Sequence, residues 1–388
     1  MRITCTGYDW KSHGVQETYF FPDGWEIQRY ALEVRLKMSE ADISRVKKQE
    51  FTYKQNRSSL YHMASNKKTV AILFDDTARP TPVSKIIPHV FESLFQAGIK
   101  KDNIRFYCAI GSHRPLTKDE LSMKLGTEIV DQFQVVCHDC FDDNIVMIGR
   151  DSYGTGIWIN KDVISSDLII GVSSIEKHKY AYAGGGSKII LPGVAGIETI
   201  RGNHSMTDAV GAAGEEKYGL WRTSMDECAE IVNGIKDFVV INSTVSARRE
   251  ITSLYIGDAV TMFRDNVEKA LETYELTFPK SHYADIGIFR MDTYDPLQAS
   301  KAMTGMFDVC RIGFITGYFS DGHVYQGMRY GPYANYEKKL DHYKGRENPK
   351  LSRFLQQDEP VFLCSPAINV RSGRCSMIPI MSQMIGTA

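Results

Sequence analysis

The sequence predicts an α/β protein of two domains, the first of which is built on a mostly parallel sheet. Three observations support this fold class. A chain of 388 residues is too long for one ordinary hydrophobic core. Its content of 43% hydrophobic and 24% charged residues is typical of globular proteins. From Lys68 onward, apolar strand-like runs alternate with helix-like segments, which is the pattern of βαβ units.

The first domain is predicted over residues 1–278. An unbroken apolar run is what a parallel strand buried on both faces requires. Such runs predict strands at Thr69–Phe74, Ile104–Ile110, Val135–Cys137 and Asp167–Val172. Between them we expect a helix over Pro82–Ala97, and Thr117 with Glu120 forms a capping box that opens another helix.

The two ends of this domain are less regular in pattern. Before the sheet we expect a strand over Glu26–Leu32 and a short exposed helix over Ser39–Lys47. After the sheet we expect a hairpin and a long amphipathic helix, formed by Phe238–Ile241, Ser253–Ile256 and Asp258–Glu275.

A second α/β pattern begins after the linker-like run at Phe278–Ser281, which puts the domain boundary near Pro279. The second domain is therefore predicted over residues 279–388. Its expected elements are strands at Ala284–Phe289, Arg311–Tyr318 and Pro360–Cys364 and a helix at Pro296–Thr304. We expect this domain to complete the substrate pocket, with the active site in the crevice between the two domains.

Charge and cysteine usage exclude several classes of function. The formal net charge of -1 implies no attraction to nucleic acid or to an anionic membrane. No apolar run is long enough to span a bilayer, and the start of the chain lacks an apolar signal region, so we expect a cytoplasmic protein. The eight cysteines are scattered, which favours reduced, buried thiols. The cluster Cys137–Cys140 lacks the second ligand pair that a zinc site needs, so we expect a structural role for it.

The stretch from Glu176 to His204 has the densest chemistry in the chain. Gly184-Gly185-Gly186 allows a ligand to approach the backbone closely, and Lys188 follows after Ser187. A glycine loop with a lysine that leads into a helix is a common way to hold an anionic group. It is not a Walker P-loop, because that motif needs a hydroxyl residue directly after the lysine.

Three polar motifs each follow a predicted strand. They are Asp75–Pro82, Gly111–Pro115 and the run that leads to His178. In parallel sheets, ligands bind at the carboxyl ends of the strands. We therefore expect the three motifs to converge on one site.

Several residues of these motifs suit acid–base and carboxylate chemistry. His113 and His178 can transfer protons near neutral pH. Arg79 can bind a carboxylate through two parallel hydrogen bonds. Gln298 and Lys301 lie three residues apart on a predicted helix, so they share one face and are candidates for the same carboxylate. Asp75 and Asp76 are candidates for binding hydroxyls or a metal. Alternatively, one of them caps the helix that starts near Pro80.

If the substrate is a 2-hydroxy acid, as the family resemblance described below implies, a two-histidine site raises a chemical question. The α-hydrogen of such an acid is too weakly acidic for histidine to remove as a proton. Loss of this hydrogen as hydride is easier, since a histidine can take the hydroxyl proton and a stable ketone results. That route needs an organic hydride acceptor, which no amino acid supplies. The sequence has no convincing G-x-G-x-x-G fingerprint for a dinucleotide.

The motifs resemble those of the nickel-pincer lactate racemase family. The resemblance covers DDTARPTP at residues 75–82, GSHRP at 111–115, the stretch 178–204 with GGGSK, and QASK at 298–301. It implies a pyridinium mononucleotide that is bonded covalently to Lys188 and holds nickel, with His204 as the nickel ligand. It further implies that His113 and His178 transfer protons. Imidazole together with soft sulfur and carbon ligands suits nickel.

The resemblance also assigns the surrounding residues. It implies that the substrate is bound by Arg79, Gln298 and Lys301, and that the residues around the cofactor are Asp76, Thr77, Gly184, Gly185, Gly186 and Ser187. Lactate-specific members carry an aromatic residue where this chain has Leu297. The resemblance therefore predicts a racemase or epimerase of 2-hydroxy acids. The candidate substrates are lactate, a longer 2-hydroxy acid and a sugar acid.

Two other functions stay open at this stage. Lys188 could form a Schiff base in a lyase or aldolase. The protein could also be a non-catalytic binder of the mononucleotide. The expected partners are a small 2-hydroxy acid and the enzymes that make and insert the cofactor, with no nucleic acid and no membrane. Whether the chain forms a homo-oligomer is left open.

Overall fold

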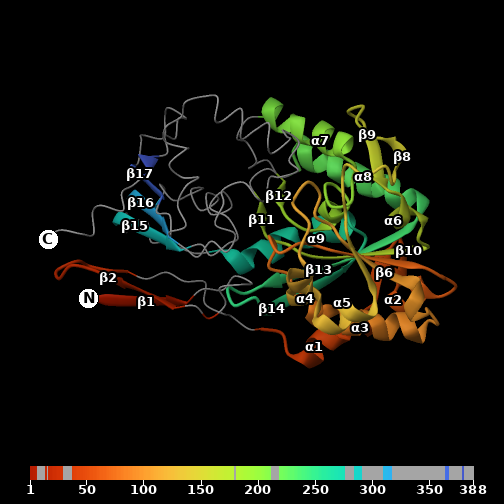
Figure 1. Cartoon of the computed structure of the whole chain (residues 1–388), viewed down its shortest axis with the longest axis horizontal. Coiled ribbons are helices and arrows are strands. Elements are labelled where there is room, and N and C mark those ends of the chain that lie inside the picture. Colours follow the sequence, from red (N-terminus) through yellow and green to blue (C-terminus); the bar gives the residue numbers. More distant parts are fainter. Residues whose placement is uncertain are drawn as a thin grey trace. The chain divides into compact units, whose positions relative to one another are not determined.

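The computed structural model describes residues 1–6, 14, 16–28, 37–178, 181–210, 218–275, 284–290, 309–316, 363–366 and 378–379 (Figure 1). By their internal contacts the residues form two compact units, 32–275 and 1–31 with 276–388. Residues 1–31 thus group with the second unit, whereas we predicted them in the first domain. The predicted boundary near Pro279 lies outside the described residues, so the division at 278/279 stays a proposal.

The larger unit contains a mostly parallel sheet, as the sequence predicts. Its six strands lie in the order β14-β13-β10-β5-β6-β7, and only the pair β13–β14 is antiparallel. The strands are β5 (Val70–Phe74), β6 (Ile104–Cys108), β7 (Gln134–Cys137), β10 (Leu168–Ser174), β13 (Asp237–Val245) and β14 (Ile251–Gly257). The expected hairpin after the sheet is the pair β13–β14.

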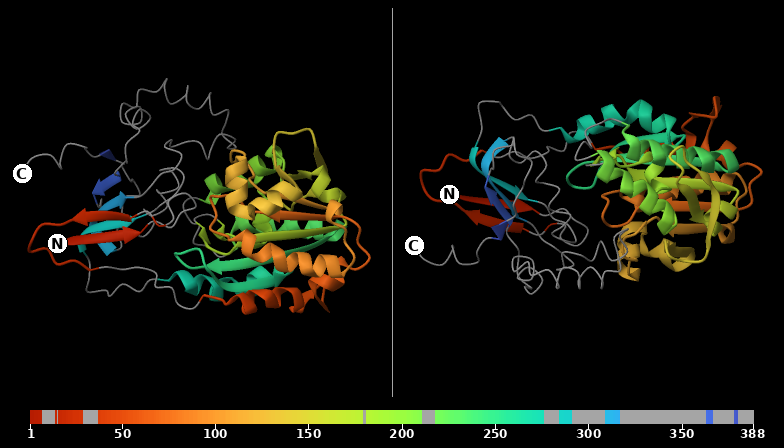
Figure 2. Two further views of the ribbon diagram at one scale, coloured as in Figure 1. Left: turned by 60° about the horizontal axis from the view of Figure 1, so that its bottom comes forward. Right: turned by 90° about the horizontal axis from the view of Figure 1, so that it is seen from above.

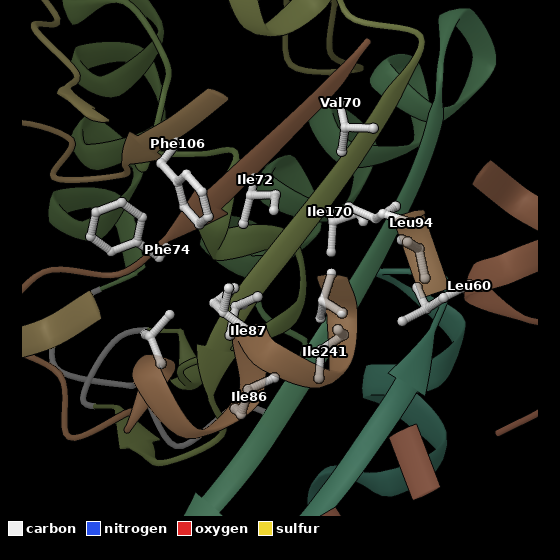
Figure 3. Packing of buried hydrophobic residues seen from close by; sticks show 14 of the residues in the cluster. Leu60, Val70, Ile72, Phe74, Ile86, Ile87, Leu94, Phe106, Ile170 and Ile241 are labelled. Atoms are coloured by element: carbon white, nitrogen blue, oxygen red, sulfur yellow. The ribbon is translucent and has the colours of Figure 1, made fainter. Parts of the chain in front are cut away.

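Both faces of this sheet are covered. Along β5, Ile72 and Phe74 pack into one core, and Ala71 and Leu73 pack into the other, because successive side chains of a strand point to opposite faces. Figure 3 shows Ile72 and Phe74 close to Phe106 in the first core. Every residue of β5 is buried, which explains the unbroken apolar run in the sequence.

Helices form the outer layers. The first core is closed by α1 (Glu40–Ser44), α2 (Leu60–Ala64), α3 (Val83–Gln96), α4 (Lys118–Leu125) and α5 (Thr127–Gln132). The second core is closed by α6 (Lys161–Ser165), α7 (Ile197–Val210) and α8 (Leu220–Ile235). Figure 1 shows α7 and α8 along one side of the sheet and α1 and α3 along the other, and Figure 2 shows the same layers from two further directions.

Local sequence signals account for several of these helices. The α3 helix buries Ile86, Ile87 and Val90 on one face, as the spacing predicts. The predicted capping box at the start of α4 is present: Thr117 accepts from the backbone of Glu120, and the Glu120 carboxylate accepts from the backbone of Thr117.

Other elements differ from the prediction in detail. The helix α9 (Thr261–Leu271) begins three residues later than expected, and just before it the Asp258 carboxylate accepts from the backbone of Val260 and Thr261. Residues 26–28 are not a strand, and the rest of that predicted strand lies outside the described residues. Elements without a long periodic signal were not predicted: β3 (Phe51–Tyr53), β4 (Asn56–Ser58), β8 (Ile145–Arg150) and β9 (Gly156–Asn160).

Short helical turns complete the larger unit. They are η1 (Arg45–Lys48), η2 (Lys101–Asn103) and η4 (Glu272–Tyr274). The first extends α1, so that the pair covers the exposed helix predicted over residues 39–47. Among the described residues, no helix has both the length and the apolar character that crossing a membrane requires.

The described residues of the smaller unit form two small sheets. One is the antiparallel pair β1 (Arg2–Thr6) and β2 (Gln16–Phe20). The other has the strand order β15 (Ala284–Arg290), β16 (Cys310–Thr316), β17 (Leu363–Pro366) and β18 (Ile378–Pro379), with β15 and β16 parallel. The strands β15 and β16 confirm the strands predicted at residues 284–289 and 311–318. The helix predicted at 296–304 lies outside the described residues.

Candidate active site

A pocket lies where β5, β6 and β10 end, and it draws on all three motifs that follow these strands. The three histidines His113, His178 and His204 line it together with Lys188 and Arg79. The remaining lining residues are Asp75, Asp76, Ala109, Ile110, Ser112, Ser173, Ser174, Gly185, Ile189, Pro192, Gly193 and Trp221.

His113 is oriented by Asp76. Its Nδ1 lies 2.6 Å from the Asp76 carboxylate. The carboxylate can only accept, so the ring proton lies on Nδ1 and the lone pair on Nε2. Asp76 is itself held by the backbone N–H of Ala78, which donates to its other oxygen at 3.0 Å. In its neutral form His113 therefore presents a proton acceptor.

Asp76 stays ionised although it is buried. Burial alone raises the pKa of this carboxyl, but the charge and hydrogen bond of His113, with Arg79 and Lys124, outweigh it and lower the pKa to about 2. Asp76 thus keeps its negative charge throughout the neutral range.

Lys124 supports the same loop from behind, and the sequence did not single it out. This lysine of α4 is fully buried and lies 2.7 Å from Asp75. It also donates to the backbone carbonyl of Arg79 at 2.9 Å, and the Thr81 hydroxyl donates to the other Asp75 oxygen at 2.5 Å. Burial raises the pKa of Asp75 and lowers that of Lys124, and the charge of each group opposes the shift of the other.

The two arginines of the motifs have different environments. Arg79 lines the pocket, and its Nη1 lies 2.8 Å from the Glu176 carboxylate. Arg114 instead binds Glu120 through two parallel hydrogen bonds of 2.8 and 2.7 Å. Arg114 thus joins the His113 loop to α4, and Arg79 is the arginine that faces the site.

His178 lies on a small hairpin of β11 (Lys177–His178) and β12 (Tyr182–Ala183). The backbone N–H of Ala181 donates to its Nδ1 at 3.2 Å. Its Nε2 lies 3.4 Å from Lys188 Nζ, which is a donor in its ammonium form. Both ring nitrogens of His178 therefore face hydrogen-bond donors, whereas Nδ1 of His113 faces a carboxylate.

The triple glycine and its serine form the turn η3 (Gly186–Ile189), which delivers Lys188. Gly185 and Lys188 line the pocket. The backbone N–H of Gly186 and the hydroxyl of Ser187 are instead bound by residues outside the pocket lining. The Gly186 N–H donates to Asn242 at 2.8 Å. The buried Ser187 hydroxyl donates to Asp226 at 2.5 Å.

Two arginines complete the support of this turn. Arg222 is 1% exposed and donates to Asp226 and to the backbone carbonyls of Ala183 and Gly185. Arg264 donates to the second oxygen of Asp226 at 2.8 Å. A buried carboxylate shared by two guanidinium groups therefore fixes the turn from behind.

His204 comes from the second turn of α7. Its Nδ1 lies 3.0 Å from the Ile200 carbonyl, which can only accept, so the lone pair lies on Nε2. Burial, followed by the nearby charge of Lys188, lowers the pKa of His204 to about 3. The ring is therefore neutral, which is the state that binds a metal ion. A carbonyl that fixes the tautomer is the usual second partner of a ligating histidine.

The buried polar groups of the pocket fit the nickel-pincer nucleotide. Ser174 is 2% exposed and lines the pocket, and its hydroxyl has no hydrogen-bond partner among the described residues. A buried hydroxyl of this kind is satisfied by a polar ligand atom or by an ordered water. Lys188 offers an amine, and His204 offers a neutral imidazole nitrogen.

The remaining predicted residues lie at the edge of the site or outside the described chain. Thr77 is half-buried in the loop of Asp76, and the Gly184 N–H donates to the Glu176 carbonyl at 2.7 Å. Neither residue lines the pocket. Gln298 and Lys301 lie outside the described residues.

The cysteine cluster at 137–140 is built around His138. Its Nε2 donates to the Ala195 carbonyl at 2.9 Å, and its Nδ1 lies 3.4 Å from the side-chain amide of Asn160. The Asn160 oxygen caps α6, so its amide nitrogen faces the ring. Both ring nitrogens are therefore occupied inside the protein. No group of three or more metal-binding side chains occurs in the part of the chain that the structure describes.

The fold and the pocket define a class: an α/β protein with a histidine, lysine and arginine site at the carboxyl edge of a parallel sheet. The model of the lactate racemase N-terminal domain matches residues 30–214. Residues 30–214 of the chain are thus similar to the N-terminal domain of the lactate racemase family.

Two relatives show the same sequence similarity. The chain is 32% identical to a lactate racemase of Thermoanaerobacterium thermosaccharolyticum over 171 residues, which are 44% of this chain and 39% of that protein. It is 37% identical over 147 residues to a lactate racemase of Lactiplantibacillus plantarum, covering 38% of this chain and 34% of that protein. Each match thus spans less than half of the relative's length.

Solved structures extend the likeness. The lactate racemase apoprotein of T. thermosaccharolyticum aligns with a TM-score of 0.65 and 27% identity over 81% of this chain and 72% of that chain. A protein of Thermotoga maritima aligns with a TM-score of 0.56 and 19% identity over 70% and 68% of the two chains, which shows a shared fold.

Proposed function

We propose that the protein is an isomerase that racemises or epimerises a 2-hydroxy acid. The observation that carries this proposal is the pair of histidines, His113 and His178, that line one pocket together with Arg79. Exchange of a hydroxyl proton on two hands of a substrate needs an acceptor and a donor at the same time.

The substrate carboxylate is assigned to Arg79. Arg79 lines the pocket, Glu176 pairs with its guanidinium, and Lys124 donates to its backbone carbonyl. A planar guanidinium fixes a carboxylate in orientation as well as in position. Gln298 and Lys301 are proposed to join it in binding the carboxylate.

The histidines then handle the hydroxyl proton. One takes the proton as the Cα hydrogen leaves as hydride, so the substrate becomes a 2-keto acid. The other would give a proton to the carbonyl oxygen as the opposite configuration of the hydroxy acid forms. The nickel-pincer nucleotide, when bound, supplies the hydride acceptor that no side chain provides.

The chain's own residues would hold that group. Lys188 is proposed as the covalent attachment point and His204 as the nickel ligand. Asp76, Thr77, Gly184, Gly185, Gly186 and Ser187 are proposed around the cofactor; of these, Asp76 and Gly185 line the pocket. Ser174 joins them on the strength of its buried hydroxyl. The enzymes that make and insert the cofactor are the proposed protein partners.

The substrate is proposed as a 2-hydroxy acid, with lactate as one candidate. The relatives are named for lactate, whereas Leu297 of this chain stands where lactate-specific members carry an aromatic residue. The cytoplasmic location and the oligomeric state stay predictions.

The test is racemisation in deuterated water by protein made together with the cofactor-synthesis enzymes. Hydride transfer retains the Cα hydrogen, whereas proton abstraction exchanges it with solvent deuterium. We expect racemisation with retention, a mononucleotide-sized adduct on the Lys188 peptide and near-stoichiometric nickel. The variant K188A should lose adduct and activity, and K177A, a change of the exposed neighbouring lysine, should keep both.

Two results would contradict the proposal. One is an unmodified Lys188 without nickel in that preparation. The other is borohydride trapping of a carbonyl substrate on Lys188, which would identify a Schiff-base lyase or aldolase. His204→Ala should lose nickel while the adduct on Lys188 remains, which separates metal binding from covalent attachment.

A further inference from the structure

One aromatic side chain contacts three functional groups of the pocket. Trp221, in the first turn of α8, is 5% exposed and lines the pocket. Lys188 Nζ lies over its ring at 5.0 Å from the centroid. The rings of His178 and His204 lie 5.4 and 4.8 Å from it, the second edge-on at 88°.

The position of this indole is fixed by its neighbours. The buried Asn203, next to His204 on α7, donates its side-chain amide to the Trp221 carbonyl at 3.0 Å. On the other side, Arg222 is held by Asp226. The backbone that carries this indole is thus anchored both to the helix that carries His204 and to the support of the glycine turn.

The chemistry of the ring face selects for cations. The π-system of tryptophan has a negative face, and it attracts an ammonium group within about 6 Å of its centroid. Lys188 already occupies such a position. A flat aromatic cation gains the same attraction and adds stacking contact, which a compact ammonium lacks.

We propose that the face of Trp221 is the binding surface for a pyridinium ring, which displaces the Lys188 ammonium from it. The proposal rests on the proposed function, since it gives the cofactor ring of that site a partner. In this arrangement one positive charge replaces another over the indole, and the two imidazoles remain beside it.

The test uses β-nicotinamide mononucleotide as a pyridinium probe with the cofactor-free full chain. The readouts are tryptophan fluorescence and the charge-transfer absorbance of an indole–pyridinium pair. We expect saturable quenching with a charge-transfer band in the wild type. Trp221→Phe should lose the band and weaken binding about tenfold, and Trp221→Tyr should weaken it less.

Two further variants sharpen the experiment. Trp158→Phe removes an exposed tryptophan of β9 and should leave affinity and band unchanged. Lys188→Met removes the competing ammonium and should tighten binding of the probe. Thermal unfolding of each variant checks that the protein is folded.

The outcomes separate this proposal from the proposed function. Absence of saturable quenching in the wild type, or an unchanged affinity and band in folded Trp221→Phe, overturns the proposal. Unchanged or weaker binding by Lys188→Met overturns the displacement of the ammonium. Racemisation by the loaded enzyme is measured independently of the probe, so its failure removes the proposed function without altering the result for Trp221.

Discussion

Lys124 Nζ lies 2.9 Å from the backbone carbonyl of Arg79 and donates a hydrogen bond to it. The same nitrogen is paired with Asp75 at 2.7 Å, and no part of Lys124 is exposed. A buried charge is costly unless it is paired and hydrogen-bonded. The α4 helix therefore contributes one ion to the loop that presents Arg79, although it contributes no residue to the pocket lining.

The first prediction concerns this contact. Lys124→Met should raise KM for the hydroxy acid about tenfold or more, because misplacement of a positioning group by about 1 Å can cost about a hundredfold. The change in kcat should be smaller, since Lys124 acts on carboxylate binding through Arg79. The measurement is steady-state racemisation by the loaded enzyme.

The controls distinguish the positioning of Arg79 by Lys124 from an effect on the stability of the protein. Lys124→Met alone leaves Asp75 buried without its partner, so the double variant Lys124→Met with Asp75→Asn is measured beside it. Leu125→Ala weakens the same helix from its buried apolar side and should leave KM unchanged. A KM that moves as much in Leu125→Ala as in the Lys124 variants would contradict the positioning role.

The second prediction concerns the dyad of Asp76 and His113. Asp76→Asn removes the carboxylate that keeps the His113 proton on Nδ1, so Nε2 loses its fixed role as acceptor. Turnover should fall by a factor of about 100–10,000, the usual contribution of acid–base catalysis. For a racemised pair, kcat/KM should fall equally for both enantiomers, because their equilibrium constant is fixed at unity.

Asp131→Asn, a change at an exposed ion pair with Lys118, is the matched control and should keep full turnover. Near-normal activity of Asp76→Asn would remove the dyad from the mechanism. If Asp76→Asn loses activity and its midpoint of thermal unfolding also falls, Asp76 stabilises the fold instead of acting in catalysis.

The third prediction concerns the dependence of stability on pH. Burial lowers the pKa of His138, with the Ala195 hydrogen bond opposing the shift. In the unfolded chain, His138 therefore takes up a proton near pH 6.5, whereas in the folded protein it stays neutral at that pH. The stability contributed by neutral His138 is present above that pH and is lost as pH falls, by at most about 1.4 kcal/mol per pH unit.

His138→Gln should make the free energy of unfolding less steep between about pH 6.5 and 5 by up to that slope. Urea unfolding at a series of pH values measures it. His62→Gln changes an exposed histidine and should leave the slope as in the wild type. An unaltered slope in His138→Gln would show that this ring is not the group involved.

The fourth prediction concerns Gly186, which has a φ of +58°. A Cβ there would lie 2.6 Å from Arg222 Nη2 and 2.7 Å from the Ala259 carbonyl oxygen. Gly186→Ala should destabilise the protein by about 3 kcal/mol or more, from overpacking and backbone strain together. Thermal or urea unfolding measures this cost.

Gly234 is the matched control. It lies in α8, and a Cβ there meets nothing within 4 Å. Gly234→Ala should stabilise the protein by about 0.5–1 kcal/mol, because alanine loses less backbone freedom in a helix. Equal effects of the two changes would show that the clash at Gly186 relaxes.

Much of the sheet and the position of the pocket could be predicted, because the signals are local. The apolar run at residues 69–74 and the capping box of Thr117 each lie within a few residues of the element they form. Motifs that follow strands meet for a topological reason that needs no distances.

The contacts between distant residues could not be predicted in this way. Lys124 meets Arg79 across 45 positions and Trp221 meets Lys188 across 33, and no periodicity records such pairs. A lysine on the buried face of a short helix, four residues after Glu120, was the available signal for the first. Ser187 looked like a ligand-facing hydroxyl, but the partner that turns it away, Asp226, lies on another helix.

The burial of β5 on both faces has a consequence for how this site can change. Every residue from Val70 to Phe74 is enclosed, so a substitution there disturbs packing before it can affect chemistry. The residues that meet the ligand stand on the loops beyond the strand ends, where a side chain can change without repacking either core. Natural variation in substrate preference is therefore expected to gather in those loops, while the strands beneath them stay constant.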